Sequence, residues 1–277
     1  MSDIEFGGGG RRLAPRHDTN RPGPDLGGAL ARGDIETFYQ PVIELASRAV
    51  VGFEALARWR GGDAVEVSPD EFLSARQKPT LVAEIGRLMS QRALEQLHQW
   101  RSADQGPVGL YVSVNVSLNE LESPQFLPEL EARLSTTSVP VSALRLEIIE
   151  REAMRNPELV ISQLNRLKAI GVMALLDDFG SGHSSLAWLS QLPVQGLKID
   201  QAFVRGLPED TASASIIRAL MRMAFDLNLT VIAEGIETAA AAEALAAFGC
   251  RYGQGYLYAP PLNAEDATAF LIASAKA

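Results

Sequence analysis

The chain has 277 residues, of which 47% are hydrophobic and 21% charged, as is typical of a globular protein with one large α/β domain or two small ones. Its 34 acidic and 25 basic residues give a formal charge of −9, which argues against binding duplex nucleic acid through a basic face. The single cysteine excludes an intramolecular disulfide, and no apolar run approaches the roughly 20 residues that a membrane span needs. We therefore expect a cytoplasmic domain without direct membrane insertion, alone or as part of a larger or membrane-tethered signalling protein.

The first 26 residues differ in composition from the rest of the chain. They are rich in Gly, Arg, Asp and Pro, with Gly7 to Gly10 in a row, and they cannot bury a core. We predict a disordered tail or linker over residues 1–26. Because no second linker interrupts the later sequence, we expect one domain over residues 27–277.

Short apolar segments alternate with helical segments along this domain. The segments that predict strands are 38–45, 50–59, 110–117, 144–150, 172–179, 196–200, 229–236 and 253–259. Only residues 46–49 separate the first two strands. These two strands should therefore pair antiparallel, since a parallel crossover takes a dozen residues or more.

Two helices in the second half have informative patterns. Asn156 and Pro157 mark the start of one helix, and Gly171 marks its end. Between residues 211 and 227, apolar residues recur at helical spacing, so we expect this stripe to pack against the sheet. The stripe consists of Ile216, Leu220, Met223, Ala224 and Leu227.

Eight strands with alternating helices in about 250 residues match the size and order of a (β/α)8 barrel. The antiparallel opening pair departs from the standard barrel. The expected fold class is therefore α/β, a TIM-like barrel with one antiparallel strand. The alternative is an open doubly wound sheet, but no Gly-rich phosphate-binding loop follows any of the predicted strands.

Acidic residues lie at the C-terminal ends of the predicted strands, where barrel enzymes carry their functional groups. The set consists of Glu54, Glu147, Asp177, Asp178 and Glu234. Together they carry −5 if ionised, Lys198 offsets +1, and two divalent cations would bring the sum to zero. Carboxylate oxygens and the carbonyl of Asn115, without Cys or a nearby His, favour Mg²⁺ or Mn²⁺ over Zn²⁺.

Taken one at a time, these residues have ordinary structural explanations. The Asp177-Asp178 pair can form a capping turn, Arg58 a surface ion pair and Lys198 an ion pair inside the barrel. Taken together, those explanations leave too many carboxylates without partners. A two-metal site suits phosphodiester hydrolysis. Glu234 is then a candidate general base, Lys198 can orient the water or neutralise phosphoryl oxygens, and Arg58 can grip a phosphate.

Eight short motifs occur in order from about residue 27 to the end of the chain. They are Gln40-Pro41, Glu54-Ala55-Leu56, Ser113 to Ser117, Glu147 to Glu150, Asp177 to Gly182, Leu197 to Asp200, Ala233 to Glu237 and Gln254 to Tyr256. Together they resemble the EAL-domain cyclic di-GMP phosphodiesterase family. Glu-Ala-Leu alone occurs by chance in many helices, whereas eight motifs in order are specific.

The resemblance implies the EAL barrel and hydrolysis of cyclic di-GMP to linear pGpG, which lowers the level of this bacterial second messenger. It also implies two Mg²⁺ or Mn²⁺ ions, with Ca²⁺ as an inhibitor, and a homodimer formed through the edge that carries the loop after Asp178. The implied ligands of the first metal are Glu54, Asn115, Glu147 and Asp177.

Further roles follow from the same resemblance. Asp177 and Asp178 are implied to bridge to or hold the second metal, Lys198 to hold a water at the metals, and Glu234 to act as general base or second-metal ligand. Substrate contacts or completion of the site are implied for Gln40, Arg58 and Gln254. Glu150 is implied to anchor the loop after Asp178, and Glu237 belongs to the same supporting layer.

One departure from the family lies at residues 74–80, where Ser-Ala-Arg-Gln-Lys-Pro-Thr replaces the usual Pro-x-Ala-Glu turn and glycine. The difference concerns this loop and any dimer or regulatory contact that it makes. The alternative function is a catalytically silent cyclic di-GMP receptor or protein-interaction module. Such relatives typically lose a metal ligand, the lysine or the loop glutamate, all of which this chain keeps. A third alternative is a two-metal barrel that acts on another phosphodiester.

Overall fold

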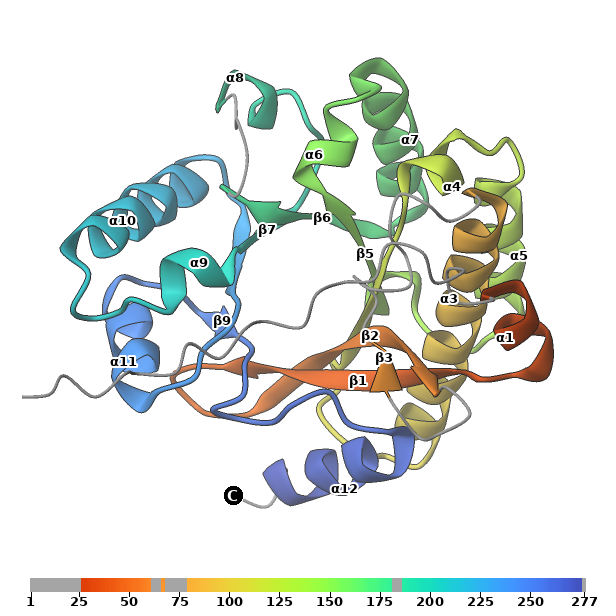
Figure 1. The fold of residues 1–277 in the computed structure, drawn as a ribbon, viewed down its shortest axis with the longest axis horizontal. Coiled ribbons are helices and arrows are strands. Elements are labelled where there is room, and N and C mark those ends of the chain that lie inside the picture. Colours follow the sequence, from red (N-terminus) through yellow and green to blue (C-terminus); the bar gives the residue numbers. More distant parts are fainter. Residues whose placement is uncertain (1–25, 61–65, 68–78, 181–185, 276–277) are drawn as a thin grey trace, which may run out of the picture.

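The computed structural model describes residues 26–60, 66–67, 79–180 and 186–275. Within these residues, eight strands close into a barrel with helices around it (Figure 1). The predicted α/β, TIM-like barrel with one antiparallel strand is confirmed. The predicted tail lies outside the described residues except for Leu26, which is buried at the start of α1 (Leu26–Arg32). Most of the unusual segment 74–80 also lies outside them.

The barrel takes its closed form from the first strand. The strands of the ring are β1 (Ile35–Glu44), β2 (Val50–Arg60), β4 (Tyr111–Asn115), β5 (Leu144–Ile149), β6 (Met173–Phe179), β7 (Gly196–Ile199), β8 (Thr230–Ala233) and β9 (Tyr252–Gly253). β1 is antiparallel to both β2 and β9, and the other neighbours in the ring are parallel. The antiparallel pairing of β1 with β2 confirms the predicted hairpin. The short strand β3 (Glu66–Val67) pairs with the end of β2.

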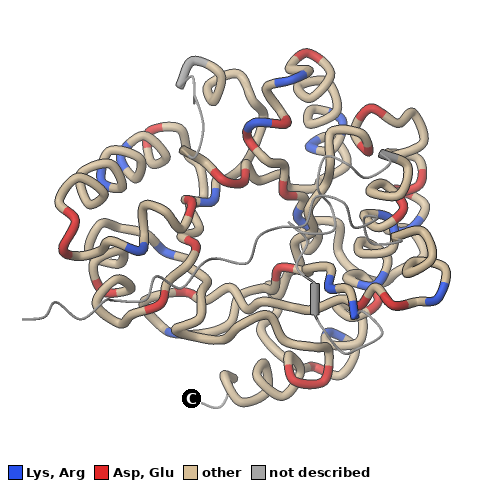
Figure 2. The backbone as a smooth tube through the Cα atoms, in the orientation of Figure 1, with Lys and Arg blue, Asp and Glu red and all other residues tan. Residues whose placement is uncertain are grey.

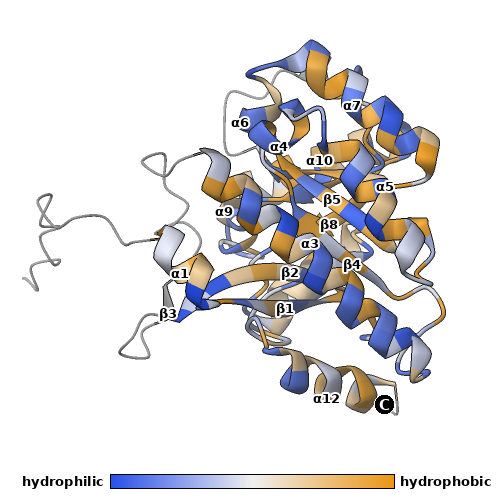
Figure 3. Cartoon of the chain, turned by 90° about the vertical axis from the view of Figure 1, so that its right-hand side faces the viewer, coloured by the Kyte–Doolittle hydropathy of each residue, from blue (hydrophilic) through white to orange (hydrophobic). Residues whose placement is uncertain are grey.

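The helices cover the outside of the ring, and many of them have one hydrophobic and one hydrophilic side (Figure 3). After α1 they are α3 (Pro79–Ser102), α4 (Leu118–Glu122), α5 (Phe126–Thr136), α6 (Glu150–Ala153), α7 (Pro157–Ile170), α8 (Leu186–Leu189), α9 (Gln201–Val204), α10 (Thr211–Asp226), α11 (Ala239–Ala247) and α12 (Ala264–Ser274), with a 3-10 turn at Val141–Ala143. None of the helices in the described part of the chain has the length and apolar character needed to cross a membrane.

A buried tryptophan contacts both the first two strands and the last helix. Trp100 of α3 packs its indole against the rings of Tyr39 and Phe53, with centroid distances of 5.3 and 4.7 Å. Its indole nitrogen donates a hydrogen bond of 2.8 Å to Thr268 Oγ1 of α12. Since α12 also packs against β1, the last helix covers the antiparallel side of the barrel (Figure 1).

The prediction for the apolar stripe of α10 is wrong at its ends. Ile216 and Leu227 are 42% and 41% exposed, whereas Ile217 is fully buried. The buried residues of this helix are Ser213, Ala214, Ile217 and Ala224. Apolar residues occupy both sides of α10, so the helical period alone could not choose the face that meets the barrel. As a result, α10 carries apolar side chains on its outer surface.

One other predicted boundary needs correction, whereas the predicted start of α7 at Asn156 and Pro157 is confirmed. The last predicted strand, 253–259, ends at Gly253, because the chain then wraps around Ile236, which accepts a hydrogen bond of 2.9 Å from the backbone of Leu257. Asn156 occupies the N-cap of α7, but its side chain donates to Glu122 at 2.9 Å instead of capping the helix. The predicted end of α7 at Gly171, where φ is +92°, is confirmed.

An aromatic ring closes the barrel interior toward the N-terminal ends of the strands. Tyr111 is 2% exposed and pairs with Gly52 across β2 and β4. A Cβ atom at Gly52 would lie 2.5 Å from the tyrosine ring, so only glycine fits there. The guanidinium of Arg145 stacks on the ring, with its carbon 3.3 Å from the centroid. Gly52, Tyr111 and Arg145 thus form a floor below the interior face of the strands.

Replacing Gly52 with alanine should destabilise the protein. The added methyl group would overpack the ring of Tyr111, and we expect the free energy of unfolding to fall by about 1–3 kcal/mol. Urea denaturation measures the difference. Gly109→Ala is the matched control, because no atom lies within 4 Å of a Cβ at that position. Equal losses in the two variants would contradict the role of the floor.

Candidate active site

One buried lysine lies at the centre of the site. The ammonium group of Lys198, on β7, is 1% exposed and faces four carboxylates. Its Nζ atom lies 3.0 Å from Glu54 and 2.7 Å from Glu147. The same atom lies 3.4 Å from Asp177 and 2.6 Å from Glu234. These residues come from β2, β5, β6 and the turn after β8, so the barrel brings together groups that are up to 180 residues apart (234 − 54).

The predicted gathering of acids at the strand ends is confirmed for three of these positions. Glu147 and Asp177 lie near the C-terminal ends of β5 and β6, and Glu234 follows β8 directly. Figure 2 shows acidic positions on the strands around the centre of the ring. Glu54 differs because it lies in the middle of β2. That strand continues to Arg60, where it pairs with β3, so its end extends past the site.

Side-chain amides orient the carboxylates. The Nδ2 atom of Asn115 donates to Glu54 at 2.9 Å. The Nε2 atom of Gln254 donates to Glu54 at 2.6 Å and to Glu234 at 3.0 Å. The Oε1 atom of Gln254 is buried and accepts no hydrogen bond from the described residues. A buried acceptor of this kind beside carboxylates suits a cation or a water molecule.

An irregularity near the end of β6 lets two adjacent carboxylates face the same space. Asp178 has a φ of +55°, in the left-handed region, and its backbone N–H donates to Asp177 at 2.9 Å. Gly180, with φ +95°, donates its backbone N–H to Glu150 at 3.1 Å. Neighbouring residues on a regular strand point to opposite faces. The left-handed residue breaks that alternation, and Glu150 holds the chain immediately after it.

The remaining predicted residues lie at different distances from this centre. Gln40 pairs with Glu54 across β1 and β2, is 9% exposed and donates to the carbonyl of Ala259 at 3.5 Å. Arg58 lies four residues beyond Glu54 on β2 and donates to the carbonyl of Ala57 at 2.8 Å.

Glu237 forms an ion pair at the surface of the protein. Its side chain is 55% exposed and contacts Arg205 at 3.6 Å. Its part in supporting the loop stays a prediction.

The charges of the site do not balance. Four carboxylates around one ammonium leave a net charge of −3 if all are ionised. Burial, reinforced by the charge of Glu54, raises the pKa of Glu147 to about 8. Burial also raises the pKa values of Asp177 and Glu234. Burial and the neighbouring Asp177 raise the pKa of Asp178 to about 6. The cluster therefore binds protons near neutral pH unless cations replace them.

Two groups in the cluster keep their charge although burial disfavours the charged form of each. Burial opposes ionisation of Glu54, but Lys198 and the amide of Gln254 outweigh it and lower the pKa of this carboxyl. Burial likewise opposes the charge of Lys198, but the carboxylates around it raise its pKa. The ion pair between Glu54 and Lys198 therefore stays ionised, and the protons that the cluster takes up bind to the other acids.

The acids form two overlapping sets whose geometry fits metal ions. One set contains Glu54, Glu147 and Asp177, and the other contains Asp177, Asp178 and Glu234. Within each set, one oxygen atom per residue lies within 4.8 Å of the others. Hard oxygen donors of this kind hold Mg²⁺ or Mn²⁺ and do not favour Zn²⁺. Because Asp177 belongs to both sets, two ions could share it.

The floor of the barrel was missed in the sequence. Arg145 lies two residues before the predicted site residue Glu147, and Tyr111 lies four residues before the predicted site residue Asn115. Both side chains point into the interior of the barrel. Residues two apart on a strand share a face, so this alternation was a usable signal. The hydroxyl of Tyr111 and the Nε and Nη1 atoms of Arg145 are buried without hydrogen-bond partners among the described residues.

Metal binding at the cluster should strengthen as pH rises. Glu147, with a pKa raised to about 8, must lose its proton before it can bind a cation. We expect the affinity for Mn²⁺ to rise about tenfold per pH unit below pH 8 for each proton displaced. Electron paramagnetic resonance of free Mn²⁺ measures this between pH 6 and 8.5. Glu147→Gln should weaken binding and flatten the profile, whereas Glu158→Gln, an exposed change on α7, should do neither. A flat profile in the unmodified protein would contradict the proton competition.

Comparisons with known proteins agree with this geometry. The family model described as EAL domain matches residues 25–261. The chain is 36% identical over 228 residues to the cyclic di-GMP phosphodiesterase PA2567 of Pseudomonas aeruginosa, covering 82% of this chain and 38% of that protein. It is 35% identical over 242 residues to the bifunctional diguanylate cyclase/cyclic di-GMP phosphodiesterase MucR of the same organism, covering 87% of this chain and 35% of MucR. The chain thus spans little more than a third of these curated relatives.

A solved structure extends the comparison. The phosphodiesterase domain of Pseudomonas aeruginosa MucR in complex with cyclic di-GMP superposes with a TM-score of 0.81 at 34% identity. This match covers 88% of the chain and 98% of that structure. The family model and the structural match both cover most of the chain. The chain therefore belongs to the EAL domain family.

Proposed function

We propose that this domain hydrolyses cyclic di-GMP to linear pGpG. The observation that carries the proposal is the pair of carboxylate sets that share Asp177 around the buried ammonium of Lys198. The names of PA2567 and MucR, both described as cyclic di-GMP phosphodiesterases, support the reaction. The cyclic di-GMP complex of the MucR domain supports the substrate.

The carboxylate sets suggest how cations would be held. Glu54, Asn115, Glu147 and Asp177 would hold one Mg²⁺ or Mn²⁺ ion, and Asp177 and Asp178 would hold a second. Asn115 would turn its carbonyl oxygen toward the ion. When bound, such ions supply charge neutralisation to the phosphate and acidify a water molecule. The net charge of −3 around Lys198 is the physical reason to expect more than one positive charge.

The residues of the chain can accept the proton that the attacking water loses. A water oxygen attacks phosphorus, the P–O3′ bond breaks, and the leaving oxygen takes a proton from a solvent water to become a hydroxyl group. Glu234, whose pKa is raised by burial, can accept the proton of the water. Lys198 stabilises the charge that develops on the phosphoryl oxygens and holds the water in position. Gln254 fixes the carboxylate of Glu234 by a hydrogen bond of 3.0 Å.

Substrate contacts extend from this centre along the hairpin of β1 and β2. Gln40 lies directly opposite Glu54, and Arg58 lies on the same face of β2 as Glu54. A guanidinium at this position can bind a phosphate oxygen of the anionic substrate. The loop after Asp178 would be held by Glu150 through Gly180, which keeps Asp178 near the second cation. Glu237 would support the same region from outside.

The alternative is a silent cyclic di-GMP receptor. A structure of the EAL domain of FimX from Pseudomonas aeruginosa bound to cyclic di-GMP matches with a TM-score of 0.76 at 26% identity. An enzyme and a receptor both bind this nucleotide, so binding alone does not separate the alternatives. This chain keeps both carboxylate sets, Lys198 and Glu150, which hydrolysis needs and mere binding does not. That observation favours the enzyme. Inhibition by Ca²⁺, a homodimer and a cytoplasmic location are further expectations that rest on the family resemblance and the composition.

Purified protein should convert cyclic di-GMP to pGpG when Mg²⁺ or Mn²⁺ is present. Excess EDTA should abolish turnover, because the cluster would then bind protons in place of cations. Nucleotide chromatography of the reaction measures both species, and titration of cyclic di-GMP measures binding separately. Tight binding with unchanged substrate would support the receptor. Hydrolysis that persists in EDTA would contradict the role of the carboxylate sets.

Replacing Glu234 with glutamine should separate binding from chemistry. The amide cannot accept a proton, so kcat should fall by about a hundredfold or more while substrate affinity stays within a few-fold. Glu243→Gln, an exposed change on α11, is the control and should keep full activity. Steady-state rates give kcat, and calorimetry with Ca²⁺ gives affinity without turnover. Full activity of Glu234→Gln would remove Glu234 from its proposed role.

A further inference from the structure

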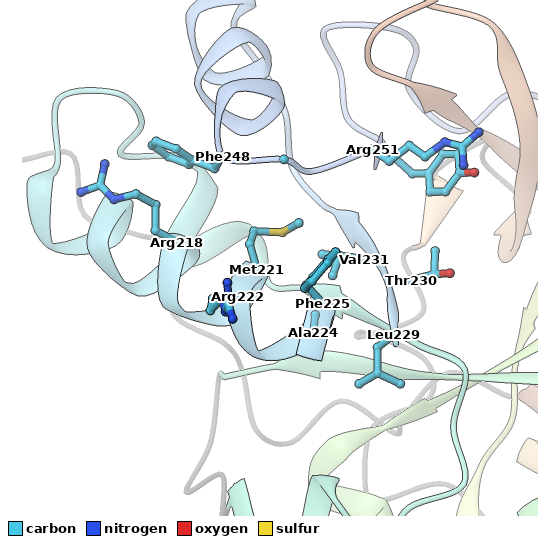
Figure 4. A pocket seen from close by; sticks show the side chains of 12 residues that line it. Arg218, Met221, Arg222, Ala224, Phe225, Leu229, Thr230, Val231, Phe248 and Arg251 are labelled. Carbon is cyan, nitrogen blue, oxygen red and sulfur yellow. The ribbon is translucent and has the colours of Figure 1, made fainter. Parts of the chain in front are cut away.

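A hollow lies at the opposite end of the barrel from the carboxylates. It has a volume of about 560 Å³ and lies between α10, the start of β8 and the turn from α11 into β9 (Figure 4). Thr230 and Tyr252, which begin β8 and β9, line it. Glu234 and Gln254 follow the other ends of the same two strands. The hollow is therefore separate from the candidate active site.

Part of the lining of this hollow is apolar, and it includes an exposed aromatic ring. Met221, Ala224, Phe225 and Leu229 contribute apolar side chains between the strands and α10 (Figure 4). Phe225 is 77% exposed, although α10 has a separate buried face against the barrel. A large ring left in water beside a hollow offers a surface on which a flat ligand can stack.

Positively charged side chains surround the apolar part of this lining. Three arginines, Arg218, Arg222 and Arg251, line the hollow, and its described lining contains no acidic residue. This concentration stands out in a chain of net charge −9. Arg218 lies 5.0 Å from the ring of Phe248, and Arg222 lies 5.9 Å from the ring of Phe225. A contact with an aromatic ring does not neutralise a guanidinium group.

The arginines keep donors for a ligand. The bonds of Arg222 to Asp226, at 3.0 Å, and of Arg251 to Glu44, at 2.8 Å, use the Nε atom. Both guanidinium side chains are well exposed, at 75% and 69%, so these ion pairs are weak and exchangeable. Within the described chain, no carboxylate lies within 4 Å of Arg218, which contacts the hydroxyl of Ser215 at 3.3 Å.

We propose that this hollow binds a small organic phosphate with a flat aromatic ring, of the mononucleotide class. Guanidinium groups bind phosphate through paired hydrogen bonds, and the exposed ring of Phe225 can stack on a base. Cavities of roughly 300–1,000 Å³ hold ligands of this size. A purely apolar ligand would leave the arginines unused, and inorganic phosphate alone would leave Phe225 unused. The proposal stands independently of the hydrolytic function.

Calorimetric titration of the purified protein with 5′-GMP tests the site. EDTA is present throughout, so the carboxylate end carries no divalent cation that could bind the phosphate of the nucleotide. Inorganic phosphate and guanosine are the comparison probes, and each should bind at least tenfold more weakly than 5′-GMP. Arg218→Gln and Phe225→Ser should each weaken 5′-GMP binding about tenfold. Arg166→Gln, a change of an exposed arginine on α7, is the matched control and should leave the affinity unchanged.

Three results would overturn the proposal. The first is no heat of binding for 5′-GMP at millimolar concentration. The second is affinity that Arg218→Gln and Phe225→Ser leave unchanged, which would place the ligand elsewhere. The third is phosphate binding as tight as 5′-GMP binding, which would remove the aromatic component. Unfolding midpoints of the variants that match the unmodified protein exclude misfolding as the cause of any loss. Because both changes are on α10, a failure here would leave the hydrolysis assay unaffected.

Discussion

The ammonium group of Lys198 holds the candidate active site together, and it neutralises only part of the charge around it. Four carboxylates from separate strands lie within 3.4 Å of one Nζ atom that is almost fully buried. Burying an unpaired charge is costly, so the remaining negative charge must be met by protons or by cations. Proton binding and metal binding therefore compete for the same oxygens. The cluster is suited to metal binding because its own lysine leaves it incompletely neutralised.

The fold supplies this arrangement through departures from regular structure. β1 closes the barrel in the antiparallel direction, which places Gln40 opposite Glu54. The left-handed backbone at Asp178 turns a second carboxylate toward the first, and Glu150 holds Gly180 just beyond it. Left-handed conformations of non-glycine residues cost free energy and persist where surrounding contacts enforce them. The strain at Asp178 is therefore consistent with a functional position.

Sequence patterns could predict the ring of strands and most of the acidic cluster, because strands have a strong apolar signal and parallel strands end on one side of a barrel. They could not predict the contact of Glu237 with Arg205, because a motif gives the neighbours of a residue along the chain but not the direction of its side chain. They also misplaced the buried face of α10, where Ile216 and Ile217 are adjacent and equally apolar. Burial depends on which neighbours cover a face, and that is a tertiary property. The pairing of Gly52 with Tyr111 depends on register, which no local pattern encodes.

The two ends of β8 and β9 carry opposite charge, and this sets an order of events. Without cations, and at a pH where its acids are ionised, the carboxylate end repels any phosphate-bearing ligand. The arginine end attracts such ligands without help from metals. At such a pH, an anionic substrate binds the carboxylate end only after its charge is neutralised, so cations bind before or together with the substrate. At low cation concentration the domain would hold anionic ligands only at its arginine end. The same short strands would then connect one site that depends on divalent cations with one that does not.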